Sequence, residues 1–173
     1  IELEEEQRKL YLAAVLDARE KLKAAKPEDK MAVFAVLMRL REICCDPHLI
    51  ADNWEGGSAK LDACTELVTS AVEGGHRILL FSQFTSMLDL LAKRLDEAGI
   101  SHFTLQGSTP KPVRAELVRR FNGGEVSVFL ISLRAGGTGL NLTAADIVIH
   151  YDPWWNVAAQ NQATDRAYRI GQQ

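Results

Sequence analysis

A group of polar side chains suited to phosphate chemistry lies near the end of the sequence, between Gln162 and Gln172. Gln162, Arg166 and Arg169 are four and three residues apart, so a helix would place them on one face. An arginine fork is permanently charged and matches the oxygens of a phosphoryl group. Two forks on one rigid helix are therefore suited to stabilising a phosphoryl group in transfer. A solvated helix face is the alternative interpretation of the same spacing.

The elements that must position this group are indicated upstream, where short apolar runs alternate with helical patterns. The runs predict buried strands at 77–83, 101–106, 127–133 and 146–151. Helical patterns occupy 58–73, 85–98 and 110–121, and a further helix capped by Asn156 follows the last strand. Strands and helices alternating at this spacing indicate an α/β fold: a parallel sheet with helices on both faces.

An N-terminal helical extension precedes this region. Helices are predicted at 3–25 and 31–45, the second with an apolar stripe formed by Met31, Phe34, Ala35 and Met38. A glycine-containing connector follows, and the character of the sequence then changes. We therefore divide the chain into a helical extension or linker, residues 1–57, and an α/β domain, residues 58–173.

The unusual sequence features follow the predicted strands, where ligands of parallel sheets bind. The loop from Arg134 to Asn141 contains three glycines and follows a buried strand, a context in which backbone amides can approach a phosphate. It lacks the Gly-Lys-Ser/Thr ending of a P-loop, and Leu142 occupies the third glycine position of a dinucleotide fingerprint. A glycine turn that lets two strands cross is the structural alternative.

Three other features each have a functional and a structural interpretation. Trp154 and Trp155 either stack on bases or sugars or pack the start of a helix. Ser108 and Thr109, before a proline-initiated helix, either donate to a phosphate or cap that helix. The histidines at 76, 102 and 150 stand alone, and we assign them to structure.

Composition limits the classes of function. The 173 residues are 47% hydrophobic and 25% charged, which is typical of a globular protein. No run reaches membrane-spanning length and no signal peptide begins the chain, so we expect an intracellular protein. The start without Met and the end just past a predicted helix indicate part of a longer protein. Cys44, Cys45 and Cys64 include no C-x-x-C pair, so we predict reduced thiols and no metal site.

The charge distribution gives a weak indication of a partner. The net charge is −3, but residues 107–142 carry five Lys and Arg against two Glu. Either a phosphate-facing surface or a solvated helix face accounts for this local excess.

Four segments, in order, resemble the second RecA-like lobe of the Swi/Snf-type DNA translocases of helicase superfamily 2. They are Ile-Leu-Leu-Phe-Ser-Gln-Phe at 78–84, the glycine loop and its continuation at 133–146, Tyr-Asp-Pro-Trp-Trp-Asn at 151–156, and residues 162–172. In the family's terms the first resembles motif IV, the glycine loop motif V and residues 162–169 motif VI. The resemblance spans about Ala59 to Gln173, and residues 37–49 also resemble the helix that leads into this lobe.

The resemblance implies an ATP-driven motor that tracks along double-stranded DNA and remodels DNA-bound proteins. ATP and Mg²⁺ would be bound mainly by the first RecA-like lobe of the same protein. Its Walker A motif does not occur in this sequence, so this chain alone is expected to be inactive. Arg166 and Arg169 would be arginine fingers delivered to ATP on closure of the lobes, with Gln162 and Gly139 lining the same cleft.

The same resemblance assigns six residues to the DNA-backbone face, a contact that carries no sequence information. These are Gly107, Ser108, Ser132, Arg134, Thr138 and Trp155. A non-catalytic RecA-like module that binds DNA or a protein is the alternative function. An RNA helicase is the nearest enzymatic alternative, although the Trp-Trp-Asn and Arg-Ile-Gly-Gln blocks favour the Swi/Snf branch.

Overall fold

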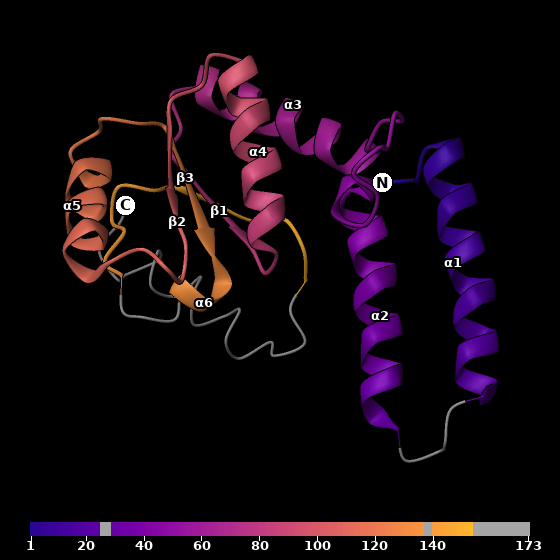
Figure 1. Cartoon of the computed structure of the whole chain (residues 1–173). Helices are drawn as coiled ribbons and strands as arrows, with labels where there is room; N and C mark the ends of the chain where they lie inside the picture. The colour runs from indigo at the N-terminus through magenta and orange to yellow at the C-terminus, as the bar shows by residue number, and fades with distance from the viewer. Residues whose placement is uncertain (25–28, 137–139, 154–173) are drawn as a thin grey trace. The chain divides into compact units, whose positions relative to one another are not determined.

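The computed structural model describes residues 1–24, 29–136 and 140–153 (Figure 1). The chain divides into two compact units, Ile1–Cys64 and Thr65–Gln173. Among the described residues, the first unit contains helices and no strand, whereas the second contains a parallel sheet.

The first unit is built on two helices, α1 (Glu5–Ala24) and α2 (Lys30–Cys45), which lie side by side (Figure 1). Asp29 caps α2 by accepting a hydrogen bond from the backbone N–H of Ala32 at 3.1 Å. Near the other end of α2, the buried Gln7 amide donates to the Ile43 carbonyl at 2.9 Å and ties α1 to it. The short helix η1 (Pro47–Leu49) follows directly.

The apolar stripe predicted on α2 is largely exposed. Met31 and Phe34 keep 75% and 49% of their surface accessible. Met38 of the stripe is partly buried, and so are Ala32, Val36 and Leu40, which are spaced four residues apart and form a neighbouring row of the helix. The periodicity identified the helix correctly, but two large members of the stripe lie exposed in this structure.

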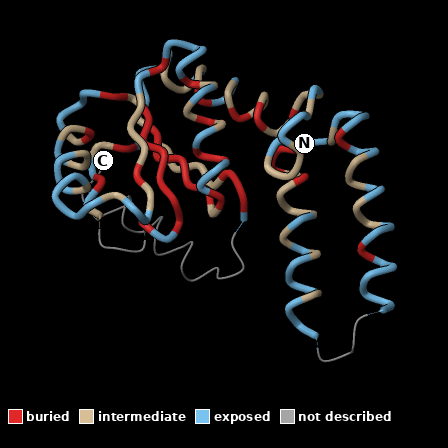
Figure 2. The backbone as a smooth tube through the Cα atoms, viewed as in Figure 1, coloured by how far each residue is buried: buried red, intermediate tan, exposed pale blue. Residues whose placement is uncertain are grey.

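In the part of the second unit that the structure describes there are four parallel strands: β1 (Ile78–Ser82), β2 (His102–Leu105), β3 (Val128–Ser132) and β4 (Ile147–His150). Their order across the sheet is β2-β3-β1-β4, which places β1 and β3 in the centre. Every residue of these two strands is buried, as expected for strands covered on both faces (Figure 2). The helix α3 (Ala59–Glu73) begins in the first unit and ends in the second. The further helices described in the second unit are α4 (Thr85–Glu97), α5 (Lys111–Asn122) and the single-turn α6 (Leu133–Gly136).

Alternate residues of the central strands face opposite sides of the sheet. Leu79 and Phe81 of β1 and Phe129 of β3 share a buried cluster with Phe121 of α5. Ile78, Leu80 and Leu130 occupy the alternate positions and therefore point to the other face. There α4 lies against the sheet (Figure 1). Its four fully buried side chains, Met87, Leu88, Leu91 and Leu95, complete the core. The predicted α/β architecture is confirmed, with strand ends within one residue of those expected.

Truncating a side chain in this core should cost far more stability than the same change at the surface. Leu130 in β3 is fully buried, so Leu130→Ala should lower the free energy of unfolding by about 2–5 kcal/mol. Leu67 in α3 is 56% exposed, and Leu67→Ala should change it by no more than about 0.5 kcal/mol. Urea unfolding of the two variants makes the comparison. Equal losses would contradict the assignment of Leu130 to the core.

Candidate nucleic-acid interface

The four parallel strands direct their carboxyl ends to one edge of the sheet, because parallel strands all point the same way. The segments that leave this edge are 82–84 after β1, 106–110 after β2, 133–136 after β3 and 151–153 after β4. Each of them contains residues that the sequence singled out. The described part of the candidate site is therefore a set of four strand ends on one edge (Figure 1).

A buried carboxylate joins the ends of β1 and β4. Asp152 is only 1% exposed and accepts a hydrogen bond from the Ser82 hydroxyl at 2.7 Å. It also accepts from the backbone N–H of Gln83, at 2.9 and 3.1 Å to its two oxygens. The Ser82 hydroxyl in turn accepts from the N–H of Phe84 at 3.2 Å. A buried charge is tolerated when hydrogen bonds satisfy it, so this network fixes the exit of both strands.

The turn after β2 exposes Gly107 and Ser108, two of the residues assigned to DNA. The backbone N–H of Thr109 donates to the Gln106 carbonyl at 3.1 Å, and the Thr109 hydroxyl accepts from the Gln106 N–H at 3.1 Å. Arg114 of α5 donates from Nε to the Thr109 carbonyl and from an Nη to the Gly107 carbonyl, both at 2.6 Å. We call residues 106–109 the β2 turn.

Ser132 and Arg134, at and just after the end of β3, were assigned by the sequence to the same surface, but they differ in exposure. Arg134 is exposed on α6, at the carboxyl edge. Ser132 is only 2% exposed, and its hydroxyl accepts a hydrogen bond from the N–H of Ala135 at 3.3 Å. Ser132 therefore shapes the turn that carries Arg134.

Two of the five basic residues in 107–142 are engaged in ion pairs on α5. Arg119 donates to Glu116 at 2.6 and 2.9 Å, and Arg120 pairs with Glu125 while lying 4.7 Å from the centre of the Phe103 ring. The hydrogen bond from Arg119 lowers the pKa of Glu116, and that from Arg120 lowers the pKa of Glu125. These two arginines of the charge excess therefore have carboxylate partners within the protein.

Six predicted site residues lie outside the described residues: Gly139, Thr138, Trp155, Gln162, Arg166 and Arg169. Of the full set, Gly107, Ser108, Ser132 and Arg134 are described. Sequence reasoning missed Asp152 and Arg114 as contributors. An acidic residue just past the strand predicted at 146–151 was the available signal for Asp152, whereas nothing local to Arg114 shows which backbone groups it meets.

The described histidines have partners that fit structural roles. His76 Nδ1 lies 2.7 Å from Asp146, which also accepts from the N–H of Arg77 and so joins the start of β1 to the start of β4. Burial acts to raise the pKa of Asp146, but the hydrogen bonds from His76 and Arg77 outweigh it and the pKa is lowered. His150 stacks on Phe81 with ring centres 5.3 Å apart, and burial lowers its pKa despite the nearby Asp152.

The cysteines show no arrangement for redox or metal chemistry in the part of the chain that the structure describes. Cys44, Cys45 and Cys64 form no disulfide, and burial raises the pKa of Cys64 to about 11, which keeps its thiol protonated. Among the described residues no three His, Cys, Asp or Glu side chains gather as they would around a metal ion. None of the described helices has the length and apolar character to cross a membrane.

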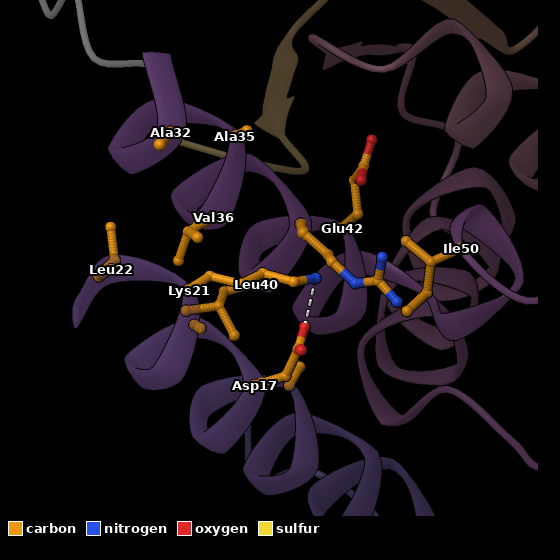
Figure 3. A pocket seen from close by; sticks show the side chains of 12 residues that line it. Asp17, Lys21, Leu22, Ala32, Ala35, Val36, Leu40, Glu42 and Ile50 are labelled. Carbon is orange, nitrogen blue, oxygen red and sulfur yellow. Dashed lines mark ion pairs between the residues drawn. The ribbon is translucent and has the colours of Figure 1, made fainter. Parts of the chain in front are cut away.

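A groove of about 490 Å³ lies in the helical unit, between α1 and α2 (Figure 3). Alanine and aliphatic side chains form much of its lining, and Asp17 and Lys21 pair across 2.7 Å at its side. It contains none of the residues that the sequence assigned to a site.

Comparison with known proteins supports a helicase lobe. The model of the helicase conserved C-terminal domain matches residues 59–171. A putative ATP-dependent helicase/translocase of Bacillus subtilis, YwqA, is 40% identical over the whole chain, which covers 20% of that protein. The human SWI/SNF-related matrix-associated actin-dependent regulator of chromatin subfamily A member 1 is 37% identical over 96% of the chain, which covers 17% of it. The chain thus spans about a fifth of the curated relatives it matches.

Similar solved structures also support a helicase lobe. The Sulfolobus solfataricus SWI2/SNF2 ATPase core in complex with dsDNA superposes with a TM-score of 0.84 at 30% identity, over 99% of this chain and 37% of that one. The C-terminal domain of a Sulfolobus solfataricus SWI2/SNF2 ATPase gives 0.79 at 28% identity, over 90% of this chain and 71% of that one.

The parallel sheet, its strand order and these superpositions define a RecA-like helicase lobe. The chain belongs to the helicase conserved C-terminal domain family, and its resemblance to the second lobe of Swi/Snf-type enzymes is confirmed.

Removing the Asp152 carboxylate should destabilise the lobe through the donors it leaves behind. Asp152→Ala should lower the free energy of unfolding by about 2–4 kcal/mol, since the Ser82 hydroxyl and the Gln83 N–H lose their acceptor. Asp152→Asn retains one acceptor oxygen and should lose less.

The partnership with Ser82 is tested by a double-mutant cycle in urea unfolding. Ser82→Ala should cost less in the Asp152→Ala background than in the wild type, because the two residues share one hydrogen bond. Strict additivity of the two losses would show that the bond contributes nothing.

Proposed function

We propose that this chain is the C-terminal motor lobe of an ATP-dependent double-stranded DNA translocase of the Swi/Snf type. The observation that carries the proposal is the match to the helicase C-terminal domain over 59–171, on a sheet whose strand ends assemble at one edge. The superposition on a SWI2/SNF2 core in complex with dsDNA supports double-stranded DNA as the partner.

In this proposal the lobe supplies positively charged arginines to the ATP site, and the nucleotide-binding loop belongs to the first lobe. The chain has no Walker A sequence, so ATP and Mg²⁺ are held mainly by the first RecA-like lobe of the same protein. Arg166 and Arg169 act as arginine fingers, and Gln162 and Gly139 line the cleft. Phosphoryl transfer spreads negative charge over the equatorial oxygens, which a fixed guanidinium stabilises. Because insertion of the fingers requires the lobes to close, hydrolysis is coupled to lobe motion.

The DNA-facing surface is proposed to use the strand ends. Gly107 and Ser108 offer backbone N–H groups and a hydroxyl, and Arg134 offers an exposed cation. Thr138 and Trp155 belong to the same proposed surface, while Ser132 contributes through the Ala135 hydrogen bond that shapes the α6 turn. Contacts of this kind read the phosphate backbone and not the base sequence, which suits an enzyme that moves along DNA.

The targets and the setting follow from the same proposal. DNA-bound proteins are the expected remodelling substrates, and the protein acts inside the cell, at the nucleoid or in the nucleus. Relatives include a putative helicase/translocase of a bacterium and a regulator of chromatin in human, so both settings fit the family.

The alternative function is a RecA-like module that binds DNA or a protein without catalysis. An assay on the isolated chain distinguishes the motor lobe from this module only in part. Purified alone, these 173 residues should hydrolyse no ATP above background, with or without duplex DNA, because the first lobe is absent. Turnover in a phosphate-release assay would contradict the division of labour between two lobes.

The deciding experiment uses the full-length protein. Duplex DNA should stimulate its ATP turnover, and Arg169→Ala should reduce that turnover about a thousandfold or more while nucleotide binding persists. Arg119→Ala is the matched control, because it removes an arginine whose partner is Glu116 on the same exposed helix face. If DNA gives no stimulation, or if Arg169→Ala behaves like the control, the interaction-module function replaces the motor.

A further inference from the structure

Arg114 joins the first turns of α5 to the β2 turn. Its planar fork donates from Nε to the Thr109 carbonyl and from an Nη to the Gly107 carbonyl, at 2.6 Å each. These are short, charge-assisted hydrogen bonds, and together they hold two carbonyls of the turn at fixed positions. We propose that Arg114 is a positioning residue for DNA-backbone binding, which sets the β2 turn so that Gly107 and Ser108 present N–H donors to a phosphate. This inference rests on the proposed function.

The turn has the polarity that an anion requires. Its carbonyls at positions 106, 107 and 109 all accept hydrogen bonds within the protein. The residues that the structure describes provide no hydrogen-bond acceptor for the backbone N–H groups of Gly107 and Ser108, and both residues are exposed. Donors open to solvent beside carbonyls that are already occupied form a surface that accepts a phosphate oxygen and does not repel it.

The Arg114 guanidinium does not itself contact the phosphate in this proposal. It is partly buried, and two of its donors point to backbone oxygens of the turn. Its charge still helps, because it offsets the negative ends of the two carbonyl dipoles that an approaching phosphate would otherwise meet. Arg114 therefore acts through the turn.

The geometry requires arginine specifically. Nε and Nη of one planar group reach two carbonyls that are two residues apart, a bidentate arrangement that a lysine ammonium does not reproduce with fixed geometry. Lysine preserves the charge but not the fork, so Arg114→Lys separates the role of position from the role of charge.

The test measures binding of the full-length protein to a fluorescent DNA duplex at several salt concentrations. Both Arg114→Ala and Arg114→Lys should weaken binding about tenfold, the scale of losing a hydrogen bond to a charged group. The slope of log affinity against log salt should stay at the wild-type value, since no phosphate-neutralising cation is lost. Arg119→Ala removes a charge from the same helix without touching the turn and should bind as the wild type does.

A double variant tests whether Arg114 acts through the turn. Ser108→Ala removes the hydroxyl that the same turn presents beside the N–H groups. It should weaken binding on its own, and should add little in the Arg114→Ala background because the turn is already displaced. If Arg114→Lys binds like the wild type, or if Arg114→Ala lowers the salt slope by about 0.9, Arg114 contacts a phosphate directly and the positioning role is overturned.

A second measurement needs no DNA and keeps this inference separate from the proposed function. Amide hydrogen exchange at Thr109, whose N–H donates to Gln106, should accelerate at least tenfold in Arg114→Lys, while the amides of β3 stay protected. Unchanged exchange at Thr109 would overturn the positioning role even if the protein is a DNA motor. Faster exchange in a protein that does not bind duplex DNA would instead contradict the proposed function and the DNA part of this inference.

Discussion

The pairing of β1 with β3 is the constraint on which the rest of the lobe depends. Five residues of each strand face one another in register, from Ile78 opposite Val128 to Ser82 opposite Ser132, and all ten are buried. A one-residue slip would exchange the side chains that meet α4 and α5. Because this register is fixed by the core, Ser82 and Ser132 end their strands at the same level, and the loops beyond them begin from one edge.

The loops are then held by side chains that satisfy backbone groups left open where the strands end. Asp152 accepts from the N–H of Gln83, and Arg114 donates to the carbonyls of the β2 turn. Asn122, at the end of α5, both donates to the Asn141 carbonyl at 2.8 Å and accepts from the N–H of Ala144 at 3.2 Å. Since buried or partly buried backbone groups require partners, these few residues decide the path of each connection.

The sequence predicted an element correctly where its residue types fit only one kind of environment, such as a strand buried on both faces. The run Val-Phe-Leu-Ile-Ser predicted β3 because apolar residues at every position suit a strand covered on both faces. It failed where a residue has several possible partners. Met31 and Phe34 form a helical stripe but lie exposed, and the excess charge at Arg119 and Arg120 is neutralised by Glu116 and Glu125. The Arg114 bonds to Gly107 and Thr109 depend on the course of the chain between β2 and α5, which composition does not encode.

In the proposed motor, the electrostatic character of the lobe suits an enzyme that releases DNA as well as holding it. Residues 58–173 carry eleven Lys and Arg against eleven Asp and Glu, and two of the five basic residues in 107–142 are paired with glutamates, so long-range attraction to DNA is modest. In the proposed motor, binding then relies on short-range contacts from the N–H groups of the β2 turn and from Arg134. Such contacts form only when a phosphate lies at the turn and are lost when the lobe shifts. A few contacts of this kind, each weak by itself, allow the lobe to release one phosphate and take the next, which a strongly basic surface would oppose.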